Sequence, residues 1–265
     1  MAPQSTAAWA PRFDGRVALI SGAASGIGAE TARQFCAAGA AVILSDRDEA
    51  NGAALADALG DSARFVPLDV TQEDQWRAAI AVGETAFDKI DIVINCAGVS
   101  KPATIEQADM AHWREILSIN LDGAFLGCKH GVAALKRAGG GAIVNVASML
   151  GARGGAMFPA YAASKWGLRG LTHSVALHCA EAGLAIRANC VLPGAIETPM
   201  LESYVRRGVA QGAPREAVLT QFAQAHAMKR VGQPTEVVAA ILFLASDGAS
   251  FITGADVPVE GGALA

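Results

Sequence analysis

The sequence lacks several features that mark well-known classes of protein. Its 21 lysines and arginines are outnumbered by 25 acidic residues, so it has no basic surplus of the kind that nucleic-acid-binding proteins carry. Its five cysteines form no C-x-x-C pair and its five histidines no paired ligand motif, which argues against a zinc site. The longest apolar run covers residues 237–245, far short of the ~20 residues that span a bilayer. We therefore expect no nucleic-acid partner, no bound metal and no membrane segment.

The remaining composition is that of a folded protein with a large core. Apolar residues make up 52% of the 265 residues and the formal net charge is only −4, which excludes an extensively disordered chain. Most cysteines lie in apolar segments, so buried thiols in a reducing, cytoplasmic compartment are expected. Residues 1–12 have neither the basic start nor the apolar stretch of a signal peptide. We expect them to form a flexible extension ahead of a single domain over residues 13–265.

Strand-like apolar runs alternate with helical patterns along this domain. The expected strands cover residues 16–21, 41–46, 63–68, 90–95, 142–147, 185–192 and 256–259. The expected helices cover residues 27–38, 49–59, 72–87, 109–136, 159–182 and 235–245, with a bend near Asn120. This order predicts an α/β fold, a Rossmann-type doubly wound parallel sheet of about seven strands with helices on both faces. Residues 199–233 break the pattern and are expected to form a small helical lid.

A glycine-rich turn separates the first strand from the first helix. Gly22, Gly26 and Gly28 have the spacing G-x-x-x-G-x-G, which lets the backbone approach a pyrophosphate at the helix N-terminus. Asp46 ends the second strand, where its carboxylate can accept hydrogen bonds from the ribose hydroxyls of a dinucleotide. The same charge would repel the additional phosphate of NADP, whereas Arg47 could attract it. We therefore expect NAD rather than NADP.

A tyrosine and a lysine lie four residues apart on one predicted helix. Tyr161 and Lys165 share a helix face, so the ammonium group can lower the pKa of the phenol from its ordinary value of roughly 10. The pair is typical of a general acid/base that works near neutral pH. Ser148 follows the predicted strand 142–147 and is a candidate hydrogen-bond donor to a substrate oxygen.

With these residues placed, the chain resembles the short-chain dehydrogenase/reductase family over residues 13–262. Residues 21–28 are similar to the family turn T-G-x-x-x-G-x-G, with Ser21 in place of Thr. Residues 95–98 resemble the N-N-A-G motif, with Cys96 in place of the second Asn. Residues 257–262 are similar to the C-terminal strand and turn, with Glu260 where Asp is usual.

The resemblance implies reversible hydride transfer between a nicotinamide and a carbinol carbon. It places the catalytic tetrad on Asn120, Ser148, Tyr161 and Lys165, with Asn120 holding a water beside Lys165. The resemblance places Thr198 in the loop that holds the nicotinamide, although Thr198 could instead serve only as the N-cap of a following helix. The implied cofactor-binding residues are Gly22, Ser25, Gly26, Ile27, Gly28, Asp46, Arg47, Asp69, Val70, Asn95, Ala97, Gly98, Tyr161, Lys165, Pro193, Gly194, Ile196 and Thr198.

The predicted mouth of the site is apolar. The candidate substrate-pocket residues are Met149, Met157, Phe158, Met200, Leu201 and Tyr204, although several could instead pack the lid onto the core. The chain is similar to bacterial hydroxysteroid and alicyclic secondary-alcohol dehydrogenases, which implies a cyclic or steroid-like alcohol or ketone. A 3-oxoacyl-thioester reductase of the same family and an inactive nucleotide-binding scaffold are the alternatives. The resemblance also implies a homotetramer, with a dimer as the alternative.

Overall fold

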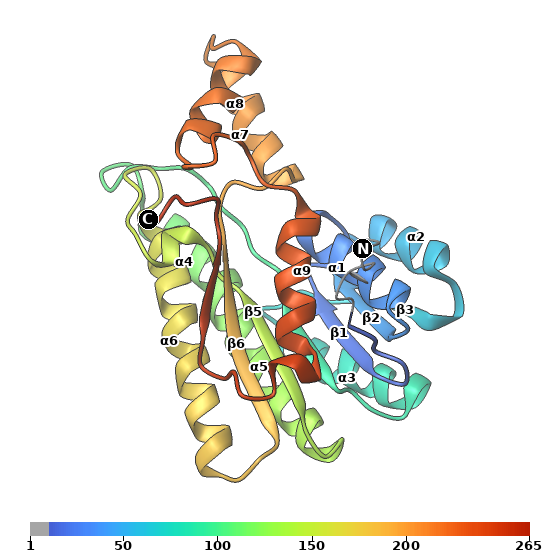
Figure 1. The fold of residues 1–265 in the computed structure, drawn as a ribbon. Coiled ribbons are helices and arrows are strands. Elements are labelled where there is room, and N and C mark those ends of the chain that lie inside the picture. The colour runs from blue at the N-terminus through green and yellow to red at the C-terminus, as the bar shows by residue number, and fades with distance from the viewer. Residues whose placement is uncertain (1–10) are drawn as a thin grey trace, which may run out of the picture.

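The computed structural model describes residues 11–265, in which the chain forms one parallel β-sheet covered by helices on both faces (Figure 1). The expected N-terminal extension lies outside the described residues, except for residues 11 and 12. The sheet order is β3-β2-β1-β4-β5-β6-β7, with every neighbouring pair parallel. The strands are β1 (Val17–Ser21), β2 (Ala41–Asp46), β3 (Ala63–Pro67), β4 (Ile92–Asn95), β5 (Gly141–Val146), β6 (Ile186–Pro193) and β7 (Asp256–Val259).

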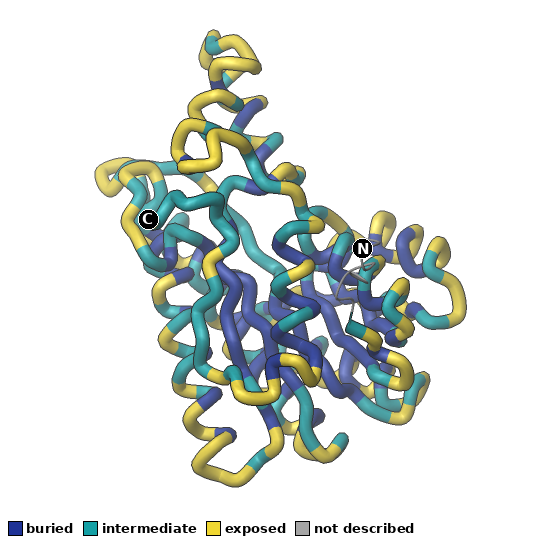
Figure 2. The backbone as a smooth tube through the Cα atoms, in the orientation of Figure 1, coloured by how far each residue is buried: buried dark blue, intermediate teal, exposed yellow. Residues whose placement is uncertain are grey.

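The helices divide between the two faces of the sheet. They are α1 (Gly26–Ala37), α2 (Glu49–Leu59), α3 (Glu73–Phe87), α4 (Met110–Leu117), α5 (Gly123–Arg137), α6 (Pro159–Glu181), α7 (Pro199–Ala210), α8 (Arg215–Gln224) and α9 (Pro234–Ala245). Buried side chains of α1, α2 and α9 pack on one face, and those of α3, α5 and α6 pack on the other. The strands form the buried centre (Figure 2), as expected for parallel strands covered on both sides. The predicted doubly wound fold is confirmed.

The strand order reverses between β1 and β4. Ligands bind beyond the carboxyl ends of the strands at such a point, because the loops there diverge and leave a crevice. Helices α7 and α8 lie within the segment expected to be a lid and project from the body of the molecule at this end of the sheet (Figure 1). No helix in residues 11–265 is long and apolar enough to cross a lipid bilayer.

The predicted helix over residues 109–136 is interrupted. A single π-helical turn, Ser118–Asp122, lies between α4 and α5 and carries Asn120 at its centre. A π turn inserts one extra residue per turn and is often found at functional sites. The Asn120 amide bonds to groups outside the helix, described below. These contacts explain why the break occurs where the sequence predicted only a bend.

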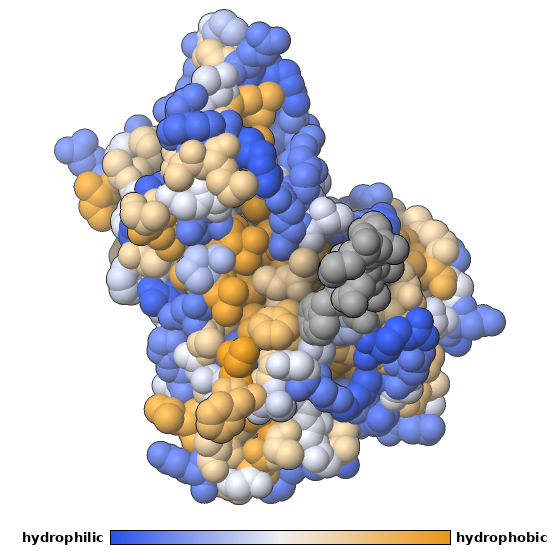
Figure 3. All heavy atoms as spheres, viewed as in Figure 1, coloured by the Kyte–Doolittle hydropathy of each residue, from blue (hydrophilic) through white to orange (hydrophobic). Residues whose placement is uncertain are grey.

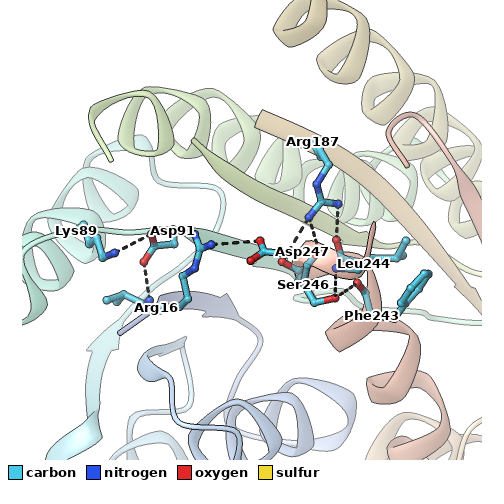
Figure 4. A network of polar contacts seen from close by, with 11 residues as sticks. Arg16, Lys89, Asp91, Arg187, Phe243, Leu244, Ser246 and Asp247 are labelled. Atoms are coloured by element: carbon cyan, nitrogen blue, oxygen red, sulfur yellow. Dashed lines mark hydrogen bonds and ion pairs between the residues drawn. The ribbon is translucent and has the colours of Figure 1, made fainter. Parts of the chain in front are cut away.

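A polar network joins the opposite, amino-terminal edge of the sheet to α9 (Figure 4). The buried Asp91 carboxylate accepts a hydrogen bond from the Val17 amide at 2.9 Å and lies 3.5 Å from the Arg16 guanidinium. Arg187 on β6 donates to the carbonyls of Leu244 at 2.7 Å and Ser246 at 2.9 Å, at the end of α9 where helix carbonyls lack intrahelical partners. These bonds hold α9 against the sheet.

Candidate active site

A cavity of about 1140 Å³ lies at the carboxyl ends of the strands. Its wall is built from the glycine-rich turn, the loops after β2, β4, β5 and β6, the first turns of α6, and helices α7 and α8. All residues that the sequence indicated as cofactor, catalytic or substrate contacts line this cavity, except Asn95 and Asn120. No group of three or more His, Cys, Asp or Glu side chains suited to a metal ion occurs in residues 11–265.

The glycine-rich turn forms one end of the cavity. Gly22 has φ +73°, and a Cβ atom there would lie 2.7 Å from the Ala97 Cα atom, so only glycine fits. Ser25 precedes α1 but its side chain makes no capping hydrogen bond. The first amides of α1 therefore remain free to bind an anion at the positive end of the helix. This end of the cavity fits the pyrophosphate of a dinucleotide.

Asp46 lies beside this turn at the end of β2. Its two carboxylate oxygens accept the Ala24 and Asp48 amides, each at 3.0 Å. These bonds hold the glycine-rich turn against β2, and each oxygen keeps lone pairs for a ribose hydroxyl. Arg47 is exposed at the same end and has no ion-pair partner among residues 11–265.

Asn95 does not line the cavity. Its side chain is buried in the core, where it donates a hydrogen bond to the Asn145 amide oxygen at 2.8 Å. Its own amide oxygen has no hydrogen-bond partner in the described part of the chain. The Asn95 side chain thus bridges β4 and β5 behind the cavity wall. The N-C-A-G pattern alone could not reveal on which side of the strand end the side chain lies.

Asn120 also lies behind the wall, where it joins two segments. Its amide oxygen accepts from the Val99 amide at 2.8 Å, and its nitrogen donates to the Val99 carbonyl at 2.9 Å and the Ser164 hydroxyl at 3.1 Å. The side chain thus fixes the loop after β4 against α6. At Gly98, a Cβ atom would lie 3.3 Å from the Asn120 oxygen and 3.4 Å from Lys165 Nζ, so the loop, Asn120 and Lys165 are closely packed.

Ser148, Tyr161 and Lys165 meet at the centre of the cavity. Ser148 caps a short 3₁₀ turn after β5, and its hydroxyl accepts from the Leu150 amide at 3.1 Å. Tyr161 and Lys165 come from the first turns of α6, which begins at a proline suited to that position. Lys165 Nζ donates to the Val146 carbonyl at 2.8 Å and lies 5.7 Å from the centre of the Tyr161 ring.

The expected lowering of the Tyr161 pKa is wrong, because its surroundings raise the pKa. Burial raises the pKa of Tyr161, the neighbouring Tyr204 raises it further, and only the hydrogen bond with Ser148 among its main influences opposes this. Burial also lowers the pKa of Lys165 to about 8. Both residues do lie on one helix, four positions apart, as predicted. However, the loss of solvation on burial outweighs any attraction between the two groups.

Aromatic rings form a row from Tyr161 to helices α7 and α8. The ring centres of Tyr161 and Phe158 are 6.4 Å apart, those of Phe158 and Tyr204 are 5.7 Å apart, and Tyr204 stacks on Phe222 at 5.9 Å. Sequence reasoning missed Phe222, because nothing in the lid sequence shows which helix face turns inward. It also missed Ser100, whose buried hydroxyl lines the cavity without a normal hydrogen bond, although it is near enough to lower the pKa of Tyr204.

His226 fixes the loop that follows β6. The buried His226 Nε2 accepts the Ala195 amide at 3.0 Å, so Nδ1 carries the proton and donates to the Phe222 carbonyl at 2.8 Å. Thr198 ends the loop as the N-cap of α7, since its hydroxyl accepts from the Leu201 amide at 3.5 Å. From the sequence, His226 is expected only to pack or to lie at the surface, because its hydrogen bond with the Ala195 amide joins segments 31 residues apart.

Comparisons with known proteins extend over nearly all of the chain. A family model described as enoyl-(acyl carrier protein) reductase, adh_short_C2, matches residues 22–263. The chain is 39% identical over 254 residues to 3-alpha-(or 20-beta)-hydroxysteroid dehydrogenase of Mycobacterium tuberculosis, covering 96% of this chain and 91% of the relative. It is 42% identical over 256 residues to cis-4-hydroxycyclohexanecarboxylate dehydrogenase of Sinomonas cyclohexanicum, covering 94% and 97%.

A third relative is 3-beta-hydroxysteroid dehydrogenase of Comamonas testosteroni, 34% identical over 253 residues that cover 96% of this chain and 97% of the relative. The residues matched by the family model include the glycine-rich turn, helices α5 and α6, and strand β7. This protein is therefore an oxidoreductase of the short-chain dehydrogenase/reductase family, whose dehydrogenases generally use nicotinamide cofactors.

Proposed function

We propose that this protein is an NAD-dependent dehydrogenase that interconverts a secondary alcohol on an apolar ring with the corresponding ketone. The observation that carries the proposal is the meeting of Ser148, Tyr161 and Lys165 between a dinucleotide-sized crevice and a row of aromatic rings. Relatives named for hydroxysteroid and hydroxycyclohexanecarboxylate substrates support a cyclic alcohol.

Each residue of the centre has a role that its surroundings support. Tyr161 exchanges a proton with the substrate oxygen, and the Ser148 hydroxyl, which is near enough to the phenol to oppose the rise in its pKa, steadies that oxygen. A nicotinamide cofactor, held by the residues of the glycine-rich turn, would supply the hydride donor or acceptor. Lys165 keeps its ammonium beside Tyr161 through its bond to the Val146 carbonyl. Asn120 acts as a positioning residue, because it fixes the loop that packs against Lys165.

The preference for NAD rests on Asp46. Its carboxylate lies at the ribose end of the crevice, where a second anion would be repelled. We expect kcat/KM with NAD to exceed that with NADP. In Asp46→Ser, the repulsion disappears and Arg47 remains available, so the ratio should move toward NADP. A wild-type enzyme that uses NADP as well as NAD would contradict this assignment.

The proposed reaction is tested by following cofactor absorbance with a panel of secondary alcohols and their ketones. Cyclohexanols and hydroxysteroids should react, and the Tyr161→Phe variant should not, although it should still bind NADH with similar affinity. If only acyclic hydroxy acids or sugars reacted, the proposal would fail. A 3-oxoacyl-thioester reductase, which the name of the matching family model supports, would instead reduce acetoacetyl thioesters in preference to cyclic ketones.

We further propose that residues 13–265 act as one domain with residues 199–233 as its lid. The Arg207 guanidinium on α7 donates to the Pro102 carbonyl at 3.1 Å, so the lid touches the loop after β4 across the cavity mouth. The five cysteines are free thiols, which supports a reducing, cytoplasmic setting.

A homotetramer is the assembly that the exposed surface supports. Apolar side chains are exposed on α5 and α6, among them Phe125, Trp166 at 50% and Leu177 at 63%. A second apolar area gathers over β7 on the face shown in Figure 3, and Phe251 is fully exposed just before that strand. Two exposed apolar areas favour two interfaces between copies of the chain, as a homotetramer requires.

A further inference from the structure

The charges around the cavity are unevenly distributed. At the nucleotide end, the acidic side chains of Asp46 and Asp69 accompany Arg47. The substrate end is lined by two arginines, Arg153 and Arg207, and by no acidic side chain. Both arginines are exposed at the rim of a largely apolar pocket, and positive charge without acidic neighbours attracts an anionic ligand to it.

Neither arginine is neutralised by the protein. Arg207 donates to the Pro102 carbonyl at 3.1 Å, and Arg153 to the Ala263 carbonyl at 3.2 Å; neither belongs to an ion pair within residues 11–265. By contrast, the lid arginine Arg215 forms a bidentate pair with Glu202 at 2.7 Å. A guanidinium has five N–H donors, so Arg207 has most of its hydrogen-bonding capacity free.

Arg207 is positioned to contact the part of a substrate ring that lies farthest from Tyr161. It follows Tyr204 by three residues on α7, so the two side chains share a helix face. Tyr204 in turn continues the aromatic row through Phe158 to Tyr161. The buried Ser100 hydroxyl, which has no normal hydrogen bond, lines the same part of the cavity and is close to Tyr204.

We infer that the substrate carries a carboxylate on its ring, remote from the reacting carbinol, and that Arg207 binds this carboxylate. The inference rests on the proposed function and names its substrate class, a hydroxycycloalkane carboxylic acid rather than a neutral steroid. Bidentate pairing of a guanidinium with a carboxylate is geometrically specific, and the Ser100 hydroxyl can donate to the same group.

Acids and their uncharged carboxamides, compared as substrates, test whether the enzyme recognises a carboxylate. The probes are trans- and cis-4-hydroxycyclohexanecarboxylate, the carboxamides of both, and cyclohexanol, each with NAD and with NADP. We expect kcat/KM for the better acid to exceed that for its carboxamide about 10- to 100-fold, and the excess to shrink as ionic strength rises. A carboxamide or a neutral hydroxysteroid that reacts as well as the acid would overturn the inference while leaving the proposed function intact. If no cyclic alcohol were oxidised, the proposed function would fail first.

Arginine variants test whether Arg207 causes the preference for the acid over the carboxamide. Arg207→Met should raise KM for the acid about 10- to 100-fold and should affect kcat/KM for the carboxamide much less, because the carboxamide has no charge to pair. Arg206→Met is the matched control, since Arg206 is the adjacent exposed arginine of α7 and does not line the cavity. Arg207→Glu should reverse the selectivity, in favour of trans-4-(aminomethyl)cyclohexanol. Equal losses on acid and carboxamide, or a loss in Arg153→Met instead, would exclude Arg207 as the carboxylate-binding residue.

Discussion

Lys165 is buried and Tyr161 is partly buried, and the loss of solvation disfavours the charged form of each. It raises the pKa of Tyr161 and lowers the pKa of Lys165 to about 8. A lysine held in this way costs folding free energy, because the unfolded chain solvates its charge fully. The catalytic centre is thus expected to be a destabilised part of the fold.

Replacing Lys165 by Met should reveal this cost through its pH dependence. The lysine pKa falls from 10.5 to about 8 on folding, so the penalty is full below pH 8 and disappears as the pH rises to 10.5. It corresponds to roughly 3 kcal/mol at neutral pH, partly offset in the variant by the unpaired Val146 carbonyl. The free energy of unfolding of Lys165→Met, relative to wild type, should therefore decrease between pH 7 and pH 10. Urea titrations at both pH values measure it, and a constant difference would contradict the buried-charge argument.

Removing the phenol oxygen tests the proton transfer at the same centre. Tyr161→Phe keeps the ring contact with Phe158 but leaves no group to exchange a proton with the substrate. We expect kcat to fall by about 10²–10⁴-fold while the dissociation constant for NADH changes little. Stopped-flow turnover and cofactor fluorescence separate the two quantities. Retention of most of the turnover would show that another group handles the proton.

At the scale of single elements, two polar side chains fix the loops that border the cavity. Asn120 uses the π turn between α4 and α5 to reach Val99, and His226 accepts the Ala195 amide from below the loop after β6. The sequence predicted a single bent helix over residues 109–136, and it indicated no more than a packing or surface position for His226. In both cases the deciding hydrogen bond joins segments that are separated in the chain, so no local pattern contains it.

His226→Leu and His226→Gln should therefore differ. Leucine leaves the buried Ala195 amide without an acceptor, which should lower the free energy of unfolding by about 1–3 kcal/mol and raise KM for the cofactor. Glutamine offers an oxygen near the position of Nε2 and should recover much of both losses. Denaturant titrations and cofactor kinetics provide the two measurements. Equal behaviour of the two variants would mean that His226 acts only by filling space.

At the scale of the whole molecule, helix α6 carries exposed apolar side chains that do not line the cavity. Trp166 and Leu177 lie on α6, the helix that also carries Tyr161 and Lys165 on its inner side. An interface that covers this face would restrain the helix, so assembly and catalysis are expected to be coupled through α6.

Charge placed on this face should dissociate the assembly. The double variant Trp166→Glu and Leu177→Glu should shift the molar mass measured by light scattering to that of a smaller species, because buried carboxylates without partners are costly. Val209→Glu, on an exposed apolar residue of the lid helix α7, serves as the control and should leave the mass unchanged. An unchanged mass for the α6 variant would place the interface elsewhere.

The sequence by itself determined the order of strands and helices, the glycine-rich turn and the spacing of Tyr161 and Lys165, because these depend on the preferences of neighbouring residues. Only the tertiary structure decided that Asn95 lies behind the cavity wall, that burial raises the pKa of Tyr161, and that Arg207 has no acidic partner at the substrate end. Solvation, burial and the pairing of charges depend on which distant segments pack together, and a linear pattern does not contain that information.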